Sequence, residues 1–191
     1  GRAQRRVPPR VGRLVRRAAR AALLAGAVFL AGASVQAQAV DGVGFSLGPP
    51  GASVVVVEFA DFACSACAEF AEATWPDVHA RYVETGRVRW TVIPFELGFR
   101  NSDEGARAGY CAAEQDLFWP MHDALFARRE TWVDERRPHD ALAALAASVG
   151  VDAERFRTCY EDDDRTERAI DDANRAAQSA GVGATASFLH D

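Results

Sequence analysis

A run of β-branched residues leads, through a short turn, into two cysteines that are three positions apart. Residues 53–60 read SVVVVEFA, which is typical of a buried strand, and residues 61–63 form the turn. Cys64-Ser65-Ala66-Cys67 follows and begins a helical pattern that continues to about residue 84. A strand, a short turn and a C-x-x-C at the start of a helix together predict an α/β fold with a redox motif.

The spacing gives the two cysteines different roles. Cys64 lies at the helix N-terminus, where unpaired N–H groups and the helix dipole stabilise a thiolate. Such positions lower a cysteine pKa from about 8.5 to roughly 3.5–7.5, and the thiolate is the nucleophile of disulfide exchange. We therefore expect Cys64 to be the exposed attacking sulfur and Cys67, one turn later, to be the shielded resolving sulfur.

Two other interpretations of the pair have less support. A zinc site needs a second pair or histidines at ligand spacing, but Cys111 and Cys159 are lone cysteines and the four histidines are scattered. A purely structural disulfide between Cys64 and Cys67 would close a very small loop and restrain little of the unfolded chain. We expect no metal and no bound cofactor, because the redox group is the cysteine pair itself.

Glu58 is a further candidate catalytic residue. It lies in the predicted strand six residues before Cys64, between Val57 and Phe59. If its side chain is buried, its pKa is raised and it can exchange protons with the resolving thiol. The alternative is that Glu58 faces solvent. Asp61, in contrast, fits a turn residue rather than a catalytic one.

The rest of the chain alternates short strands with a long helical block. The segment before the first strand, residues 40–51, is predicted to be extended, and Pro76 should kink the helix that the cysteines begin. Further strands are expected at residues 88–95 and 185–189, and helices at 102–129, 138–149, 152–160 and 165–180. Asp152 is the expected N-cap of the helix at 152–160.

The N-terminus has the composition of an export signal. Eight arginines fall within residues 2–20, an uncharged apolar run covers residues 21–35, and Ala37-Gln38-Ala39 suits signal peptidase. We therefore predict a signal peptide at residues 1–39 and a periplasmic or other extracytoplasmic location. The alternative is an uncleaved helix that anchors the protein to the membrane. Residues 40–191 carry 14 arginines against 27 acidic residues, a balance that argues against nucleic-acid binding.

Several segments together resemble the DsbA-like thiol:disulfide oxidoreductase family of the thioredoxin superfamily. The first is VVVVEFADFACSAC, which is followed by an alanine-rich helix that contains Trp75-Pro76. The others are residues 107–126, Phe156-Arg157-Thr158-Cys159 and residues 181–185, and the likeness covers about residues 46–189.

The resemblance implies a thioredoxin-like fold over residues 40–191, with a helical domain inserted at roughly residues 99–165. It implies that Cys64 and Cys67 are the redox pair and that Glu58 lies beneath them. Exported proteins with free thiols would be the substrates, oxidised through a mixed disulfide. A membrane quinone-linked thiol oxidase would reoxidise the pair.

The sequence departs from the family pattern at three places. The family's substrate-binding loop has a cis-proline after threonine, but here Ala186 follows Thr185, so we expect a trans peptide. The dipeptide Ser65-Ala66 replaces the Pro-His of the most oxidising members, which predicts a milder oxidant. The family continues past residue 189 with another strand and helix, so we expect the last strand and helix to be missing.

Two cysteines and one histidine remain to be assigned a role. In an exported protein two leftover cysteines are expected to pair, so we predict a structural disulfide between Cys111 and Cys159. The alternative is two buried free thiols. His122 is far in sequence from Cys64 and Cys67, and we expect it to serve packing rather than catalysis.

The sequence thus predicts an exported thiol-disulfide oxidoreductase that forms disulfides in other proteins. Two alternatives remain. One is a disulfide reductase or isomerase, which the reduction potential would separate from an oxidase. The other is a catalytically impaired thioredoxin-fold module that binds or holds partner proteins without turnover.

Overall fold

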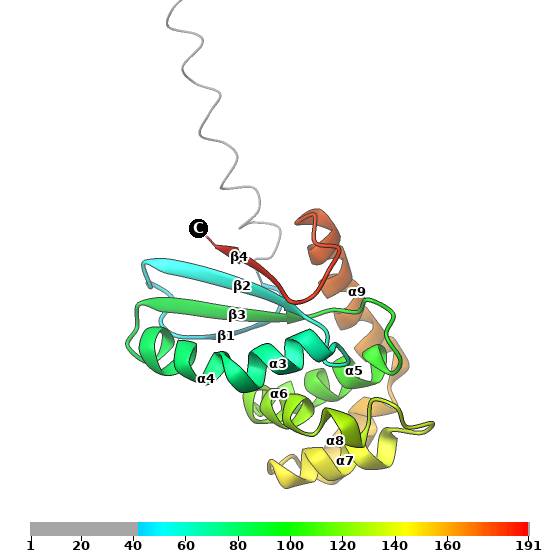
Figure 1. Ribbon diagram of the computed structural model, residues 1–191. Coiled ribbons are helices and arrows are strands. Elements are labelled where there is room, and N and C mark those ends of the chain that lie inside the picture. The colour runs from blue at the N-terminus through cyan, green and yellow to red at the C-terminus, as the bar shows by residue number, and fades with distance from the viewer. Residues whose placement is uncertain (1–41, 191) are drawn as a thin grey trace, which may run out of the picture. The chain divides into compact units, whose positions relative to one another are not determined.

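The computed structural model describes residues 42–190 (Figure 1). The predicted signal peptide, residues 1–39, lies outside this range. Within the described range, no helix combines the length and the hydrophobicity that crossing a membrane requires.

A four-stranded sheet forms one part of the molecule. Its strands are β1 (Phe45–Leu47), β2 (Val54–Ala60), β3 (Val88–Pro94) and β4 (Ser187–His190), in the order β1-β3-β2-β4. Strands β2 and β3 are parallel neighbours at the centre, and the two outer strands pair antiparallel with them. The central strands are buried towards their C-terminal ends, and this is the end of β2 that leads to Cys64.

Strand β1 lies in the segment that the sequence indicated only as an extended lead-in. It pairs with β3, and a glycine stands just before it and just after it. Gly44 and Gly48 both have a φ of +86°, and a Cβ at either would collide with the backbone of β3. Glycine therefore allows the close approach that makes this segment a strand.

The cysteine pair begins a helix that is interrupted before Pro76. Helix α3 (Ser65–Ala73) ends at Thr74, α4 (Trp75–Val78) follows with its proline in the first turn, and η1 (His79–Val83) is a π-helical turn. The predicted disturbance at Pro76 is confirmed. It takes the form of a break, because proline removes a hydrogen bond and is tolerated only in the first turn of a helix.

The helical block contains α5 (Ser102–Ala113), α6 (Phe118–Ala127), η2 (Arg129–Thr131), α7 (His139–Ser148) and α8 (Ala153–Tyr160). The prediction of one continuous helix over residues 102–129 is wrong. Asp116 adopts a left-handed conformation, with φ +61°, and turns the chain between α5 and α6. The predicted N-cap is confirmed, since the Asp152 carboxylate accepts a 2.9 Å hydrogen bond from the Arg155 backbone N–H.

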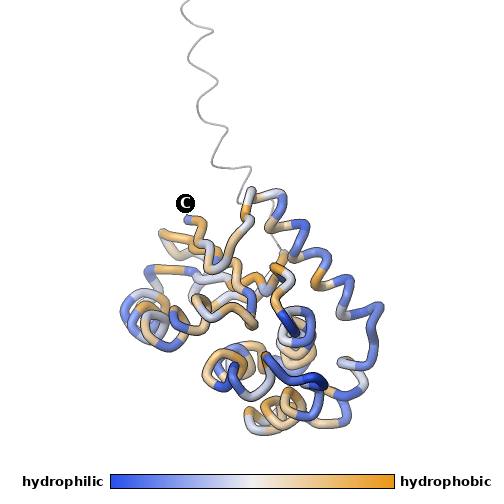
Figure 2. The backbone as a smooth tube through the Cα atoms, turned by 45° about the vertical axis from the view of Figure 1, so that its right-hand side comes forward, coloured by the Kyte–Doolittle hydropathy of each residue, from blue (hydrophilic) through white to orange (hydrophobic). Residues whose placement is uncertain are grey.

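The two faces of the sheet have different covers because side chains alternate along each strand. Val57 and Phe59 of β2 face α9 (Asp163–Ser179) and pack against its alanines at positions 173, 176 and 177. Figure 2 shows α9 as a mostly hydrophilic helix with hydrophobic turns. Ala60 packs on the other face, in a larger core that includes Cys64, Cys67 and the helical block. Helices α7 and α8 lie farthest from the sheet (Figure 1).

Candidate active site

Cys64 is the N-cap of α3 and follows directly from the turn at the end of β2. Its backbone is extended, with φ −77° and ψ 125°, and its N–H donates to the Asp61 carbonyl at 3.0 Å. The backbone N–H groups of Ala66 and Cys67 in the first turn of α3 are directed at its sulfur. The strand thus delivers Cys64 to the end of a helix where amide dipoles stabilise negative charge.

The two thiols differ in accessibility. The side chain of Cys67 is fully buried, whereas Cys64 retains 6% exposure. The expectation of a freely exposed Cys64 sulfur is therefore wrong. The loop before β4 covers this sulfur, and its Sγ lies 3.9 Å from the Thr185 carbonyl oxygen. Cys64 nevertheless remains the more accessible sulfur of the pair.

The two thiols also differ in acidity. Partial burial opposes ionisation of Cys64, but the nearby Thr185 hydroxyl and the amides of α3 outweigh it and lower its pKa. Burial raises the pKa of Cys67 to about 12, and proximity to Cys64 adds to that increase. Both cysteines are free thiols in the structure. Cys64 is therefore the sulfur that ionises first and is suited to attack or to leave as thiolate, whereas Cys67 holds its proton near neutral pH.

The loop that faces the cysteines differs from the sequence expectation. The Thr185–Ala186 peptide is cis, so the prediction of a trans peptide is wrong. The Cys64 sulfur lies against the Thr185 carbonyl of this loop, and within the loop the Ser187 hydroxyl donates to the Ala184 carbonyl at 2.7 Å. The Thr185 hydroxyl is buried and makes no hydrogen bond among the described residues, although it lies close enough to both sulfurs to lower their pKa values.

Glu58 is buried within the core, with 2% exposure, so the alternative of a solvent-facing side chain is wrong. Its Oε2 accepts a 3.0 Å hydrogen bond from Nε1 of Trp90 on the adjacent strand β3. Burial raises the pKa of Glu58, and the charge of His122 and the Trp90 hydrogen bond offset part of that rise. A buried carboxyl of this kind keeps its proton to a higher pH than an exposed glutamate does.

His122 serves packing, as expected, but it also interacts with Glu58. Its ring lies 2% exposed on α6, with ring centroids 5.9 Å from Phe62 and 5.0 Å from Phe126. It is close enough to Glu58 for a positive charge on the imidazole to lower the carboxyl pKa. Sequence reasoning missed this link because α6 is brought to β2 only by the fold.

Replacing Glu58 by glutamine should stabilise the protein near neutral pH. The pKa of Glu58 in the folded state lies above its ordinary value of 4.5. As the pH rises above 4.5, Glu58 therefore ionises first in the unfolded chain, and the free energy of unfolding falls. The glutamine side chain cannot ionise and keeps an oxygen that accepts from Trp90. Urea unfolding should show Glu58→Gln more stable than the wild type at about pH 7 and equal to it at about pH 3. A variant less stable at about pH 7 would contradict this account.

Asp61 anchors the turn, in agreement with the sequence interpretation. Its carboxylate is 1% exposed and accepts from the Ala63 backbone N–H at 2.8 Å and the Leu97 backbone N–H at 3.0 Å. The Ser102 hydroxyl of α5 donates to the same carboxylate at 2.7 Å. Arg129 of η2 donates from Nε to the Ala63 carbonyl oxygen at 2.7 Å, and its Nη2 contacts the same oxygen. Nothing in the local sequence pattern indicated Ser102 or Arg129.

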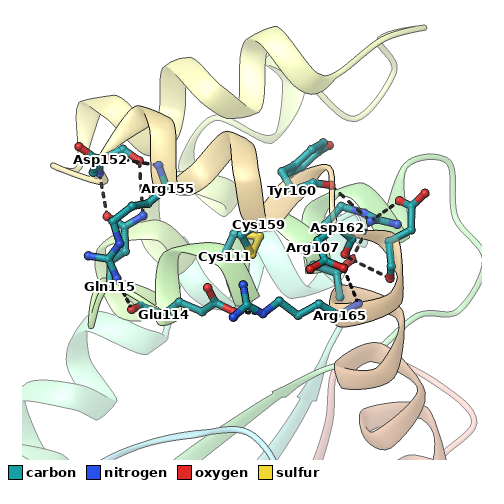
Figure 3. The surroundings of a disulfide bond; sticks show 12 residues. Arg107, Cys111, Glu114, Gln115, Asp152, Arg155, Cys159, Tyr160, Asp162 and Arg165 are labelled. Carbon is teal, nitrogen blue, oxygen red and sulfur yellow. Dashed lines mark hydrogen bonds and ion pairs between the residues drawn. A yellow bond between two sulfur atoms is a disulfide. The ribbon is translucent and has the colours of Figure 1, made fainter.

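Cys111 and Cys159 form a disulfide between α5 and α8, the pairing that the sequence analysis expected (Figure 3). The S–S distance is 2.01 Å, and both side chains are buried. Polar contacts surround the bond: Glu114 pairs with Arg165 at 3.0 Å, and the Asp152 backbone N–H donates to Gln115 at 2.9 Å (Figure 3). The disulfide therefore ties together two helices of the block.

A site for a metal ion needs several ligating side chains close together. No cluster of three or more potential metal-ligating side chains is found among residues 42–190.

Comparisons with known proteins show the family to which the chain belongs. Residues 41–191 match a family model described as Thioredoxin. The probable disulfide bond formation protein D of Bacillus cereus is 30% identical over 149 residues, which are 76% of this chain and 69% of that protein. A putative protein-disulfide oxidoreductase of Rickettsia felis is 24% identical over 150 residues, which are 78% of this chain and 54% of that protein.

A solved structure shows the same arrangement of elements. BdbD from Bacillus subtilis, in its oxidised form, aligns with a TM-score of 0.69 and 22% identity over 77% of this chain and 80% of that chain. The likeness shows a shared fold, and the fold class predicted from the sequence is confirmed.

Proposed function

Because the chain belongs to the thioredoxin family, in its DsbA-like group, we propose that it is an exported enzyme that forms disulfides in proteins with free thiols. The observation that carries the proposal is the asymmetry of the cysteine pair. Cys64 is an N-cap residue with a lowered pKa, and Cys67 is buried with a pKa of about 12. One thiol is suited to exchange with a partner, and the other is suited to resolve the product.

The reaction begins from the oxidised pair. A substrate thiolate attacks Sγ of Cys64, the Cys64–Cys67 bond breaks, and Cys67 leaves and takes up a proton. A second substrate thiolate then attacks the substrate sulfur of the mixed disulfide and releases Cys64 as thiolate. The substrate loses two electrons, which remain on the reduced pair. The lowered pKa of Cys64 makes it a good leaving group and so favours transfer of the disulfide to the substrate.

Two further groups support these steps. The loop with Thr185 and Ala186 lies against the Cys64 sulfur, where it would hold the substrate backbone next to the reacting thiol. Glu58 would exchange a proton with Cys67 when the pair is reduced or oxidised. Its Oε2 accepts a hydrogen bond from Trp90, and an ordered water would carry the proton between the carboxyl and the thiol.

The oxidising compartment is supported by two observations. The sequence predicts a signal peptide at residues 1–39, and the structure contains the buried Cys111–Cys159 disulfide. Structural disulfides persist outside the cytoplasm. In that setting a membrane quinone-linked thiol oxidase would return the Cys64–Cys67 pair to the disulfide state.

Measurement of the reduction potential and of substrate oxidation tests the proposal. The oxidised protein should convert a reduced, unfolded substrate protein to its disulfide form in proportion to the amount added. The potential of the Cys64–Cys67 pair should lie above that of thioredoxin, about −270 mV. A potential at or below about −270 mV, with no substrate oxidation, would assign the protein to the reductases.

A further inference from the structure

We propose that Arg129 is a positioning residue for the reactive thiol: from the helical block, it holds the peptide group before Cys64 and thereby keeps the Cys64 sulfur at the helix N-terminus. This inference deepens the proposed function, since it rests on the assignment of Cys64 as the reactive thiol. Arg129 lies 66 residues after Ala63 in the chain, yet its side chain reaches the turn that Ala63 ends.

The contact joins one guanidinium to one buried carbonyl. Arg129 Nε donates to the Ala63 carbonyl oxygen at 2.7 Å, and Nη2 of the same guanidinium group contacts that oxygen. Ala63 is 1% exposed, and Arg129 itself is half-buried. Among the ion pairs of the described residues, none joins Arg129 to a carboxylate. The guanidinium is therefore directed at the active-site turn rather than at a neighbouring acid.

The peptide bond transmits this contact to Cys64. The Ala63 carbonyl and the Cys64 N–H belong to the same planar peptide group. Arg129 holds the oxygen of that group, and the Asp61 carbonyl accepts from its N–H at 3.0 Å. With both ends held, the orientation of the plane and of the N–Cα bond of Cys64 is fixed, and the extended φ of −77° then sets where the Cys64 side chain leaves the backbone.

The rest of the turn is held from the same side of the molecule. Ser102 of α5 donates to the Asp61 carboxylate at 2.7 Å, and the Asp61 carboxylate accepts from the Ala63 N–H. Arg129 adds positive charge to a turn that contains this buried carboxyl. The placement of the peptide group keeps the Cys64 sulfur beside the amides of α3, which stabilise its thiolate, and the guanidinium charge would add to that stabilisation.

The planar guanidinium of arginine suits this positioning role better than the ammonium group of lysine. Arginine presents several N–H donors in fixed directions, so two of them address one oxygen and define its direction. Lysine at position 129 would keep the charge and lose the fork. The two contributions of Arg129, charge and direction, are therefore separable by substitution.

The test compares three variants in the reduced protein without any substrate. Arg129→Met removes the charge and the donors, Arg129→Lys keeps only the charge, and Arg128→Met is the matched control at the exposed neighbouring arginine. The rate of Cys64 alkylation by iodoacetamide is followed against pH, and the modified site is identified by mass spectrometry. Circular dichroism shows whether each variant is folded.

Arg129→Met should raise the Cys64 pKa by about one unit, which is about a tenfold loss of thiolate below that pKa. Arg129→Lys should give a smaller rise, and Arg128→Met should leave the pKa unchanged. An unchanged pKa in folded Arg129→Met, or an equal rise in Arg128→Met, would overturn the inference. If Arg129→Met does not fold, Arg129→Lys decides: a raised pKa supports positioning, and the wild-type pKa contradicts it.

This experiment also separates the inference from the proposed function. The alkylation of Cys64 needs no partner protein, so the effect of Arg129 is measurable even if the protein oxidises no substrate. Conversely, normal substrate oxidation together with an unchanged Cys64 pKa in Arg129→Met would reject the role of Arg129 and leave the proposed function intact.

Discussion

Replacement of Cys64 by serine should lower the rate of substrate oxidation at least about a thousandfold, the scale of loss when a catalytic nucleophile is removed. A serine hydroxyl cannot form the mixed disulfide. Cys67 cannot take its place, because it is fully buried and its pKa is about 12. The measurement is the rate of disulfide formation in a reduced, unfolded protein, with glutathione disulfide as terminal oxidant.

The same variants, with a binding measurement added, separate an enzyme from a binding module. A module that holds partner proteins without turnover would bind the unfolded substrate equally well after both Cys64 and Cys67 are changed to serine. Full oxidation activity in Cys64→Ser would refute the mechanism. Loss of oxidation in Cys64→Ser, with wild-type folding by circular dichroism, would support it.

Removal of the second disulfide should have the largest effect on stability. Cys111 and Cys159 are separated by 48 residues, and chain-entropy reasoning assigns about 4 kcal/mol of unfolding free energy to a loop of that size. The paired variant Cys111→Ala/Cys159→Ala keeps small apolar side chains in the core, so it isolates the effect of the covalent link. Urea unfolding should show this loss without a change in secondary structure.

The other cysteine pair provides the control. A bond between Cys64 and Cys67 closes only one helical turn and restrains little of the unfolded chain. In the oxidised protein, Cys64→Ala/Cys67→Ala should therefore lose much less stability than the paired variant at positions 111 and 159. A loss below about 1 kcal/mol on removing the Cys111–Cys159 bond would show that the bond does not restrain the unfolded state as expected.

Local sequence patterns were sufficient for the core of the site. The β-branched run, the turn and the C-x-x-C specify a strand and a helix whose junction is Cys64, and the structure has that junction. Alternation along β2 did not decide which face Glu58 occupies, because a strand buried on both sides has no polar face. In the structure, the hydrogen bond from Trp90 and the helices packed on the same face of the sheet show that the Glu58 side chain points into the core.

Other features depend on contacts between distant segments. The strand β1 exists only through its pairing with β3, a segment far along the chain, and the cis peptide at Ala186 and the left-handed turn at Asp116 were not predicted either. The partners of the active-site turn, Ser102 and Arg129, come from helices far along the chain. A single sequence does not contain the distances that bring these side chains together.

The most direct test of the central claim is to trap the mixed disulfide with the Cys67→Ser variant. Without its resolving thiol, the variant should remain covalently attached to a substrate protein when it meets a substrate activated as a mixed disulfide. Peptide mapping by mass spectrometry should place the bond at Cys64. A stable adduct at Cys64 would confirm that this sulfur exchanges with substrates. Absence of an adduct, or an adduct at Cys111 or Cys159 in the folded protein, would contradict the account.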